Sequence, residues 1–214
     1  MEEILCSIRK CEDCKILNRF TPCVFGSAQS RILVVSDSPP RTEYTGTASR
    51  PPLGVVMARG TLEGRWTPAF ARERWRNEDW LDISKQFNSR NFFWIHRANC
   101  AEELGGNREH CTSKFMENAI SLIKPTLSLI LIFGRYAAGY FFPNRDFLEL
   151  VRRRDLVDSK HGLKCCVLYH WSPRNKQRNL HQEDHDMALK DAKKIVHEIL
   201  SLKHQAGART NADD

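Results

Sequence analysis

The sequence has no apolar run long enough to cross a membrane. Its longest apolar stretch, residues 127–133, is far shorter than the ~20 residues that a membrane-spanning helix needs. The amino terminus, MEEILCSIRKC, also lacks the uninterrupted apolar segment of a signal peptide. We therefore expect a soluble, cytoplasmic protein with no membrane partner.

Acidic residues are too few to balance the basic ones. The chain has 33 Lys and Arg against 26 Asp and Glu, which gives a net charge of +7 and a pI near 9.1. A basic balance of this size favours an anionic partner, and nucleic acid is the commonest one.

Internal repeats are absent as well, and the length suits a single compact domain. The 214 residues are 41% hydrophobic, which is enough to build one core. The last ten residues, QAGARTNADD, are polar and have no helical or strand periodicity. We expect one domain at residues 1–204, a disordered tail at 205–214, and a monomer.

Apolar runs and helical spacing alternate along the chain. Short apolar runs, the first of them rich in β-branched residues, predict strands at residues 31–36, 92–95, 128–133 and 165–169. The segments with helical spacing are residues 68–86, 109–124, 134–142 and 183–203. Buried strands separated by helices indicate βαβ units, so we predict an α/β fold, a three-layer α/β/α sandwich around a four-stranded parallel sheet. Ligands of such sheets bind at the carboxyl ends of the strands.

Cysteine is not scarce, and its placement points to a metal site. Thiols stay reduced in the cytosol, so eight cysteines argue for metal ligation or buried thiols rather than for disulfides. The run KCEDC puts Cys11 and Cys14 on one turn, and Cys100 and Cys111 lie in a loop and at the start of a helix after the second predicted strand. Together these four thiolates would suit an iron–sulfur cluster or zinc.

The other four cysteines have lesser roles in this interpretation. Cys165 and Cys166 lie inside a predicted strand, where cysteine usually acts as a small hydrophobic residue. Cys6 and Cys23 are spare ligands.

The order of motifs resembles a known family. KCEDC is followed by CVFGSAQSRILVVSDSPPRTEYTG, NCAEELGGNREHC, LIKPTLSLILIFGRYAAGYFF and YHWSPRN. This order is similar to that of the iron–sulfur uracil-DNA glycosylases, families 4 and 5 of the uracil-DNA glycosylase superfamily, over roughly residues 10–178. The resemblance implies a 4Fe–4S cluster on Cys11, Cys14, Cys100 and Cys111, with zinc as the alternative. It also implies a DNA glycosylase that acts in base excision repair on DNA containing a modified base.

Excision of a base needs a donor for the departing base and a carboxylate near the sugar. The base leaves the stack, and the sugar passes through an oxocarbenium-like state while the base becomes negative. YHWSPRN resembles the HPSPRN motif of the single-strand-selective monofunctional glycosylases, which makes His170 the expected donor. The residues after it are expected to contact DNA: Ser172, Pro173, Arg174, Asn175, Lys176 and Arg178.

The first motif departs from the family pattern. Residues 36–40 read SDSPP where the family has Gly-Glu-Ala-Pro-Gly, and Asp37 and Glu43 keep carboxylates at the two expected places for water activation. Leu53 stands where the family has a Phe that stacks on the base, so Tyr44 is an alternative stacking group. The resemblance also places Ser38 at the base pocket.

The second predicted strand ends in another departure. His96 stands four residues before Cys100, where the family has an Asn that reads the uracil edge. An imidazole cannot present a donor and an acceptor in the geometry of an amide, so the preferred base need not be uracil. The alternative for His96 is a core histidine. The alternatives for the whole protein are a relative that crosslinks covalently to uracil-DNA, a non-catalytic iron–sulfur nucleic-acid-binding protein with a degenerate pocket, and a zinc-stabilised structural module.

Overall fold

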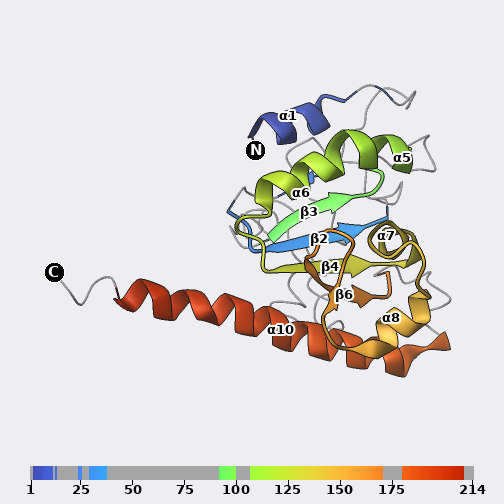
Figure 1. The fold of residues 1–214 in the computed structure, drawn as a ribbon, viewed down its shortest axis with the longest axis vertical. Coiled ribbons are helices and arrows are strands. Elements are labelled where there is room, and N and C mark those ends of the chain that lie inside the picture. Colours follow the sequence, from blue (N-terminus) through green and yellow to red (C-terminus); the bar gives the residue numbers. More distant parts are fainter. Residues whose placement is uncertain are drawn as a thin grey trace, which may run out of the picture.

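The computed structural model describes residues 2–11, 13, 24–25, 29–37, 92–99, 107–170 and 180–209 of the chain (Figure 1). The helices and strands there are, in chain order, α1 (Glu2–Arg9), β1 (Val24–Phe25), β2 (Ile32–Ser36), β3 (Phe92–His96), α5 (Arg108–Cys111), the π-helical turn η3 (Thr112–Met116), α6 (Glu117–Ile123), β4 (Leu129–Phe133), α7 (Arg135–Phe141), α8 (Phe147–Arg153), β5 (Val157–Asp158), β6 (Lys164–Leu168) and α10 (Gln182–Arg209).

The sheet has six strands in the order β1-β3-β2-β4-β6-β5. The inner four, β3, β2, β4 and β6, are parallel, and they are the four strands that the sequence predicts. β1 and β5 pair antiparallel with the outer members of this group. The α/β class is therefore confirmed, but the predicted count of four strands is wrong, because a two-residue strand is too short to show a hydrophobic period.

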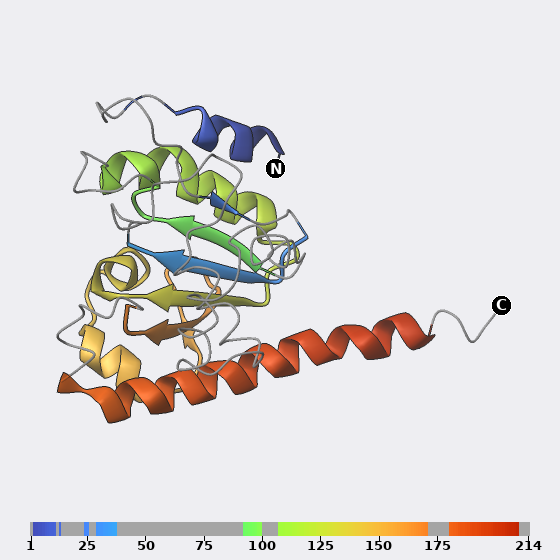
Figure 2. The ribbon, with the colours of Figure 1, turned by 180° about the vertical axis from the view of Figure 1, so that it is seen from behind.

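Burial explains why the inner strands read as continuous apolar runs. Every residue of β2, β3 and β4 is buried, so both faces of the sheet are covered. In the two opposite views the sheet lies between α1, α5 and α6 on one side and α8 and α10 on the other (Figures 1 and 2). Val196 of α10 and Ile8 of α1 are fully buried in this core.

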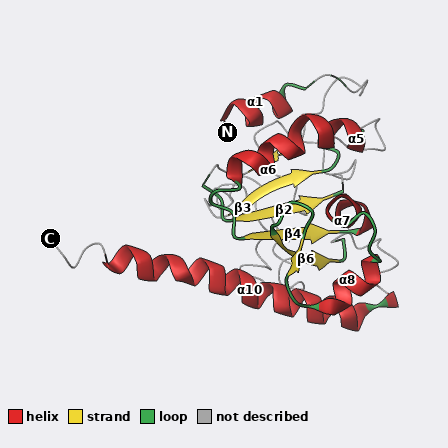
Figure 3. Cartoon of the chain, in the orientation of Figure 1, coloured by secondary structure: helices red, strands yellow, loops and turns green. Residues whose placement is uncertain are grey.

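The predicted helices are present where the structure describes them, with changed limits (Figure 3). The helix expected at 109–124 consists of α5, η3 and α6, and the Asn107 side chain caps its start by accepting from the His110 N–H at 3.0 Å. α10 continues to Arg209, beyond the expected end at 203 and into the first residues of the predicted tail. The helix expected at 68–86 lies outside the described residues. In the part of the chain that the structure describes, every helix is too short or too polar to span a bilayer.

The turn from β4 into α7 depends on Gly134. Its φ is +97°, a conformation that residues with a Cβ rarely adopt. A Cβ on Gly134 would lie 2.9 Å from Asp37 Oδ2 and 3.3 Å from His170 Cβ. The glycine therefore allows α7 to begin close to the ends of β2 and β6.

We expect Gly134→Ala to destabilise the fold by about 1–3 kcal/mol, because the new methyl group meets both a strained φ and the Asp37 carboxylate. Gly139→Ala is the matched control, since Gly139 lies in α7 with no atom within 4 Å of an added Cβ. This control should stabilise α7 by about 0.5–1 kcal/mol. Urea unfolding of both variants measures the difference, and equal stabilities would contradict the account of this turn.

Candidate functional site

The carboxyl ends of the parallel strands gather polar side chains at one edge of the sheet. Ser36 ends β2 and His96 ends β3, and the register of the two strands makes them direct neighbours. Ser36 Oγ lies 2.6 Å from His96 Nδ1, so the two side chains share a hydrogen bond. α7 begins at the same edge, beside the tips of β2 and β4 (Figure 1).

Burial keeps His96 neutral. Its side chain is 4% exposed, and removal from water lowers the pKa of the imidazole to about 3. His170 adds to this effect, which places the two rings near each other. His96 Nε2 is buried and has no hydrogen-bond partner among the described residues. The core-histidine alternative accounts for the Nδ1 atom, which Ser36 binds, and leaves Nε2 unexplained.

Asp37 holds the start of α7. Its Oδ1 accepts the main-chain N–H of Ala137 at 2.7 Å, in the manner of a helix cap supplied by another segment. Its Oδ2 and His170 Cβ both border Gly134. Two of the residues predicted to be catalytic, Asp37 and His170, therefore converge with His96 at the strand ends.

Arg97 connects the helices that flank this edge. Its guanidinium is largely buried, donates to the Tyr136 carbonyl oxygen at 2.7 Å and pairs with Glu109 at 3.0 Å. The main-chain N–H groups of Arg97 and Ala98 donate to the carbonyl oxygens of Ser36 and Asp37, each at 2.8 Å. The main-chain bonds extend the β2–β3 pairing past the strand ends.

The remaining predicted site residues lie outside the described residues, and their roles stay predictions. These residues are Ser38, Glu43, Tyr44, Leu53, Ser172, Pro173, Arg174, Asn175, Lys176 and Arg178.

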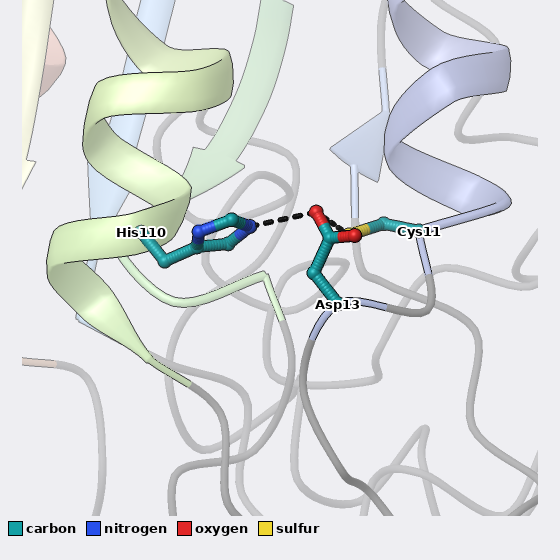
Figure 4. A group of neighbouring side chains, drawn as sticks. All are labelled: Cys11, Asp13 and His110. Atoms are coloured by element: carbon teal, nitrogen blue, oxygen red, sulfur yellow. Dashed lines mark hydrogen bonds and ion pairs between the residues drawn. The ribbon is translucent and has the colours of Figure 1, made fainter.

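The segment that contains Cys11 lies beside α5, almost a hundred residues along the chain. Asp13 joins the two, because its Oδ2 accepts from His110 Nε2 at 2.8 Å (Figure 4). The same oxygen accepts from the Lys114 ammonium group. These bonds, that to Lys114 above all, lower the pKa of Asp13 to about 2. The Cys11 thiol donates weakly to the same oxygen at 3.5 Å.

One cysteine of each predicted pair reaches this region. Cys11 is half-buried and Cys111 is buried, and both pack against the main core. The hydrogen bond to Asp13 is the main cause that raises the pKa of Lys114, and Cys11 and Cys111 each add a smaller effect. Cys14 and Cys100 lie outside the described residues. Cys165 and Cys166 are buried within β6, as the sequence predicts.

The donor atoms offer two kinds of metal site. Cys11 Sγ, a carboxylate oxygen of Asp13 and a ring nitrogen of His110 lie within 4.8 Å of one another, a mixed donor set that zinc accepts. Cys111 is not in this group, and a site made of thiolates would need it beside Cys11. An open hollow of about 610 Å³ is lined by Cys11, Asp13 and Cys6.

Sequence reasoning missed Ser36, Asp13 and His110. The available signals were weak: Asp13 lies between the two cysteines of KCEDC, and His110 precedes Cys111. Only the register of β2 and β3 reveals the Ser36 contact.

No protein-family model and no curated protein matches this chain. Its function must therefore be inferred from the site itself.

The low pKa of His96 makes stability depend on pH. The unfolded histidine binds a proton near pH 6.5, whereas the folded one does so near pH 3. The free energy of unfolding is therefore not reduced by this histidine above pH 6.5, and it falls as the pH is lowered toward 3. When the pH is lowered from about 7 to about 5, the free energy of unfolding should fall by about 1–2 kcal/mol more in the wild type than in His96→Gln.

Urea unfolding at the two pH values measures this difference. His197→Gln is the control, because His197 is exposed on α10. The burial argument fails if His96→Gln and the wild type lose the same stability.

Proposed function

We propose that this chain is a monofunctional DNA glycosylase of the uracil-DNA glycosylase superfamily that hydrolyses the N-glycosidic bond of a deaminated or damaged base, uracil or a related one. The observation that carries this proposal is the convergence of Asp37, His96 and His170 at the carboxyl ends of the parallel strands. The mixed α/β fold with helices on both sides supports a three-layer α/β/α sandwich, whose ligands bind at that edge.

The three side chains suit the charges that develop during base excision. The departing base gains negative charge, which a hydrogen bond from His170 would stabilise. The sugar gains positive charge, and the Asp37 carboxylate beside Gly134 would favour it and orient a water molecule. His96 is neutral and buried, so it would hydrogen-bond to the base without adding a charge.

The thiols near Lys114 support an iron–sulfur cluster. Cys11, Cys14, Cys100 and Cys111 would hold a 4Fe–4S cluster, and the contact of the Cys11 segment with α5, which ends at Cys111, supports this set. Four thiolates give such a site a net negative charge, which the Lys114 ammonium offsets. When bound, the cluster would crosslink the amino-terminal segment to α5. The alternative is zinc on Cys11, Asp13 and His110.

A basic protein of this kind would bind DNA largely through its phosphates. The net charge of +7 supports such binding, and the segment after His170 carries the expected contacts. We expect a monomer, as for an enzyme that needs one chain for one flipped base.

One observation favours a second function. The Asp37 carboxylate already caps α7 through Oδ1, as a purely structural residue would. A non-catalytic nucleic-acid-binding protein with this fold is therefore the second candidate. A covalent uracil-DNA crosslinking relative is a further alternative. It would need an imidazole that attacks the sugar, and the two histidines at this edge are His96, which Ser36 binds, and His170.

The activity is tested with oligonucleotides that each contain one uracil, hypoxanthine, xanthine or mismatched thymine. Protein purified without air should release at least one free base and leave an abasic site. His170→Ala should slow this reaction about 10²–10³-fold, because it removes the donor to the departing base. His197→Ala, on the exposed face of α10, should not.

If every substrate stays intact while the protein binds DNA, the non-catalytic function is correct. A protein–DNA adduct that survives denaturation would identify the crosslinking relative.

The metal content separates the two donor sets. Protein purified without air should be brown and contain about four iron atoms per chain, and Cys111→Ser should lose them. Cys166→Ala is the matched control, since Cys166 is buried in β6 and should leave the iron in place. Colourless protein with one zinc that His110→Gln removes would contradict the cluster.

A further inference from the structure

Tyr136 is an exposed aromatic side chain at the carboxyl edge of the sheet. It lies in the first turn of α7, and 55% of its surface is exposed. Its main chain is held from two sides, because Arg97 donates to the Tyr136 carbonyl oxygen at 2.7 Å and Asp37 accepts the next N–H, that of Ala137, at 2.7 Å. The ring therefore extends into solvent from a fixed point of the backbone.

One face of the Tyr136 ring is covered by a guanidinium group from another segment. Arg108 Cζ lies 4.0 Å from the ring centroid, in cation–π contact. Arg108 begins α5, which the pair of Glu109 with Arg97 at 3.0 Å joins to the same edge. A ring that is stacked on one face and still more than half exposed offers its other face to a second planar group.

The charges around this ring are mostly positive. Arg135 precedes Tyr136 and is exposed, and Arg108 lies on the ring itself. The acidic neighbour Glu109 is paired with Arg97. An aromatic face among arginines is the arrangement that holds single-stranded nucleic acid, because bases stack on the ring while cations bind the phosphates. The net charge of +7 favours the same kind of polyanion.

Tyr136 lies close to the candidate catalytic groups. It is two residues past Gly134, where an added Cβ would meet Asp37 and His170. Two steps along the main chain span at most about 8 Å between Cα atoms. A DNA strand that enters the candidate site therefore passes near the ring.

We propose that the Tyr136 ring, backed by Arg108, is a stacking platform for an unpaired base of the DNA strand that enters the site. This inference rests on the proposed function, because it takes DNA as the ligand. Bases inside a duplex have both faces covered by their neighbours, so the platform binds only a base that is unpaired. Every base has a π-face, so the platform is indifferent to sequence. The protein thus holds its strand in a locally single-stranded form.

The test measures binding of the full chain, by fluorescence anisotropy, to three probes without a damaged base. They are a short oligothymidylate, a duplex of the same length, and a fully abasic oligonucleotide that keeps the phosphates and lacks the bases. Tyr136→Ala should weaken binding of the oligothymidylate about 5–100-fold, the effect of losing one base–aromatic stack. It should change binding of the duplex and of the abasic probe by less than about twofold.

Two further variants keep the test sharp. Tyr136→Leu keeps an apolar side chain and loses the ring, so it should show the same selective loss even if Tyr136→Ala fails to fold. Leu122→Ala is the matched control, because Leu122 is 48% exposed on α6 and has no part in the platform. This control should bind all three probes as the wild type does.

The outcomes separate the platform from the proposed enzyme. Selective loss of oligothymidylate binding supports the platform whether or not the protein excises a base. Equal losses on the oligothymidylate and the abasic probe would mean that Tyr136 acts only by holding Arg108 against a phosphate, which overturns the platform. Unchanged binding of the oligothymidylate, or an equal loss on the duplex, also overturns it. Base excision by the same protein would leave the proposed function standing in either case.

Discussion

The parallel pairing of β2 with both β3 and β4 is the constraint on which the candidate site depends. It aligns Ser36 with His96, and it ends β4 where Gly134 can turn the chain into α7. Because the strands run in one direction, their polar final residues meet at one edge instead of alternating between two. β6 joins the same group, so His170, two residues past its end, reaches that edge from a distant part of the chain.

Burial then decides which of these polar groups carry charge. His96 is buried and stays neutral, while the Asp37 carboxyl group accepts the Ala137 N–H in the first turn of α7. A neutral ring beside a carboxylate and a half-buried second histidine is a suitable environment for a reaction that separates charge between a sugar and a base. Just after α5, the Lys114 ammonium group pairs with Asp13. The two regions share α5, whose Glu109 pairs with Arg97 and whose His110 pairs with Asp13.

The sequence was sufficient to predict the elements that have a strong period. The inner strands are continuous apolar runs because both of their faces are buried, and the stripe of apolar residues on α10 faces the core. β1 and β5 have two residues each, so local pattern could not reveal them. The short helix α8 was missed as well, although Asp146, which caps it through the Glu149 N–H, precedes Glu149 by the three residues typical of a capping box.

The candidate site was predictable by residue type and only partly by contact. The strand-end rule directed attention to Asp37, His96 and His170, and these three do converge. Their partners were not predictable, because the contacts of Ser36 with His96 and of Asp13 with His110 depend on register and on the docking of distant segments. The same limit applies to the metal ligands: spacing groups Cys11 with Cys14, but only the fold brings the segment of Cys11 to α5.

The central claim is that the carboxyl edge of the sheet receives a nucleobase. A crystal structure of the protein with an oligonucleotide that carries a non-cleavable analogue of a deaminated nucleotide tests it most directly. The account predicts that the modified base is extruded from the DNA and lies within hydrogen-bond distance of His170 and of His96 Nε2. A base that stays stacked in the DNA, or DNA that binds on another face and leaves this edge untouched, would contradict it.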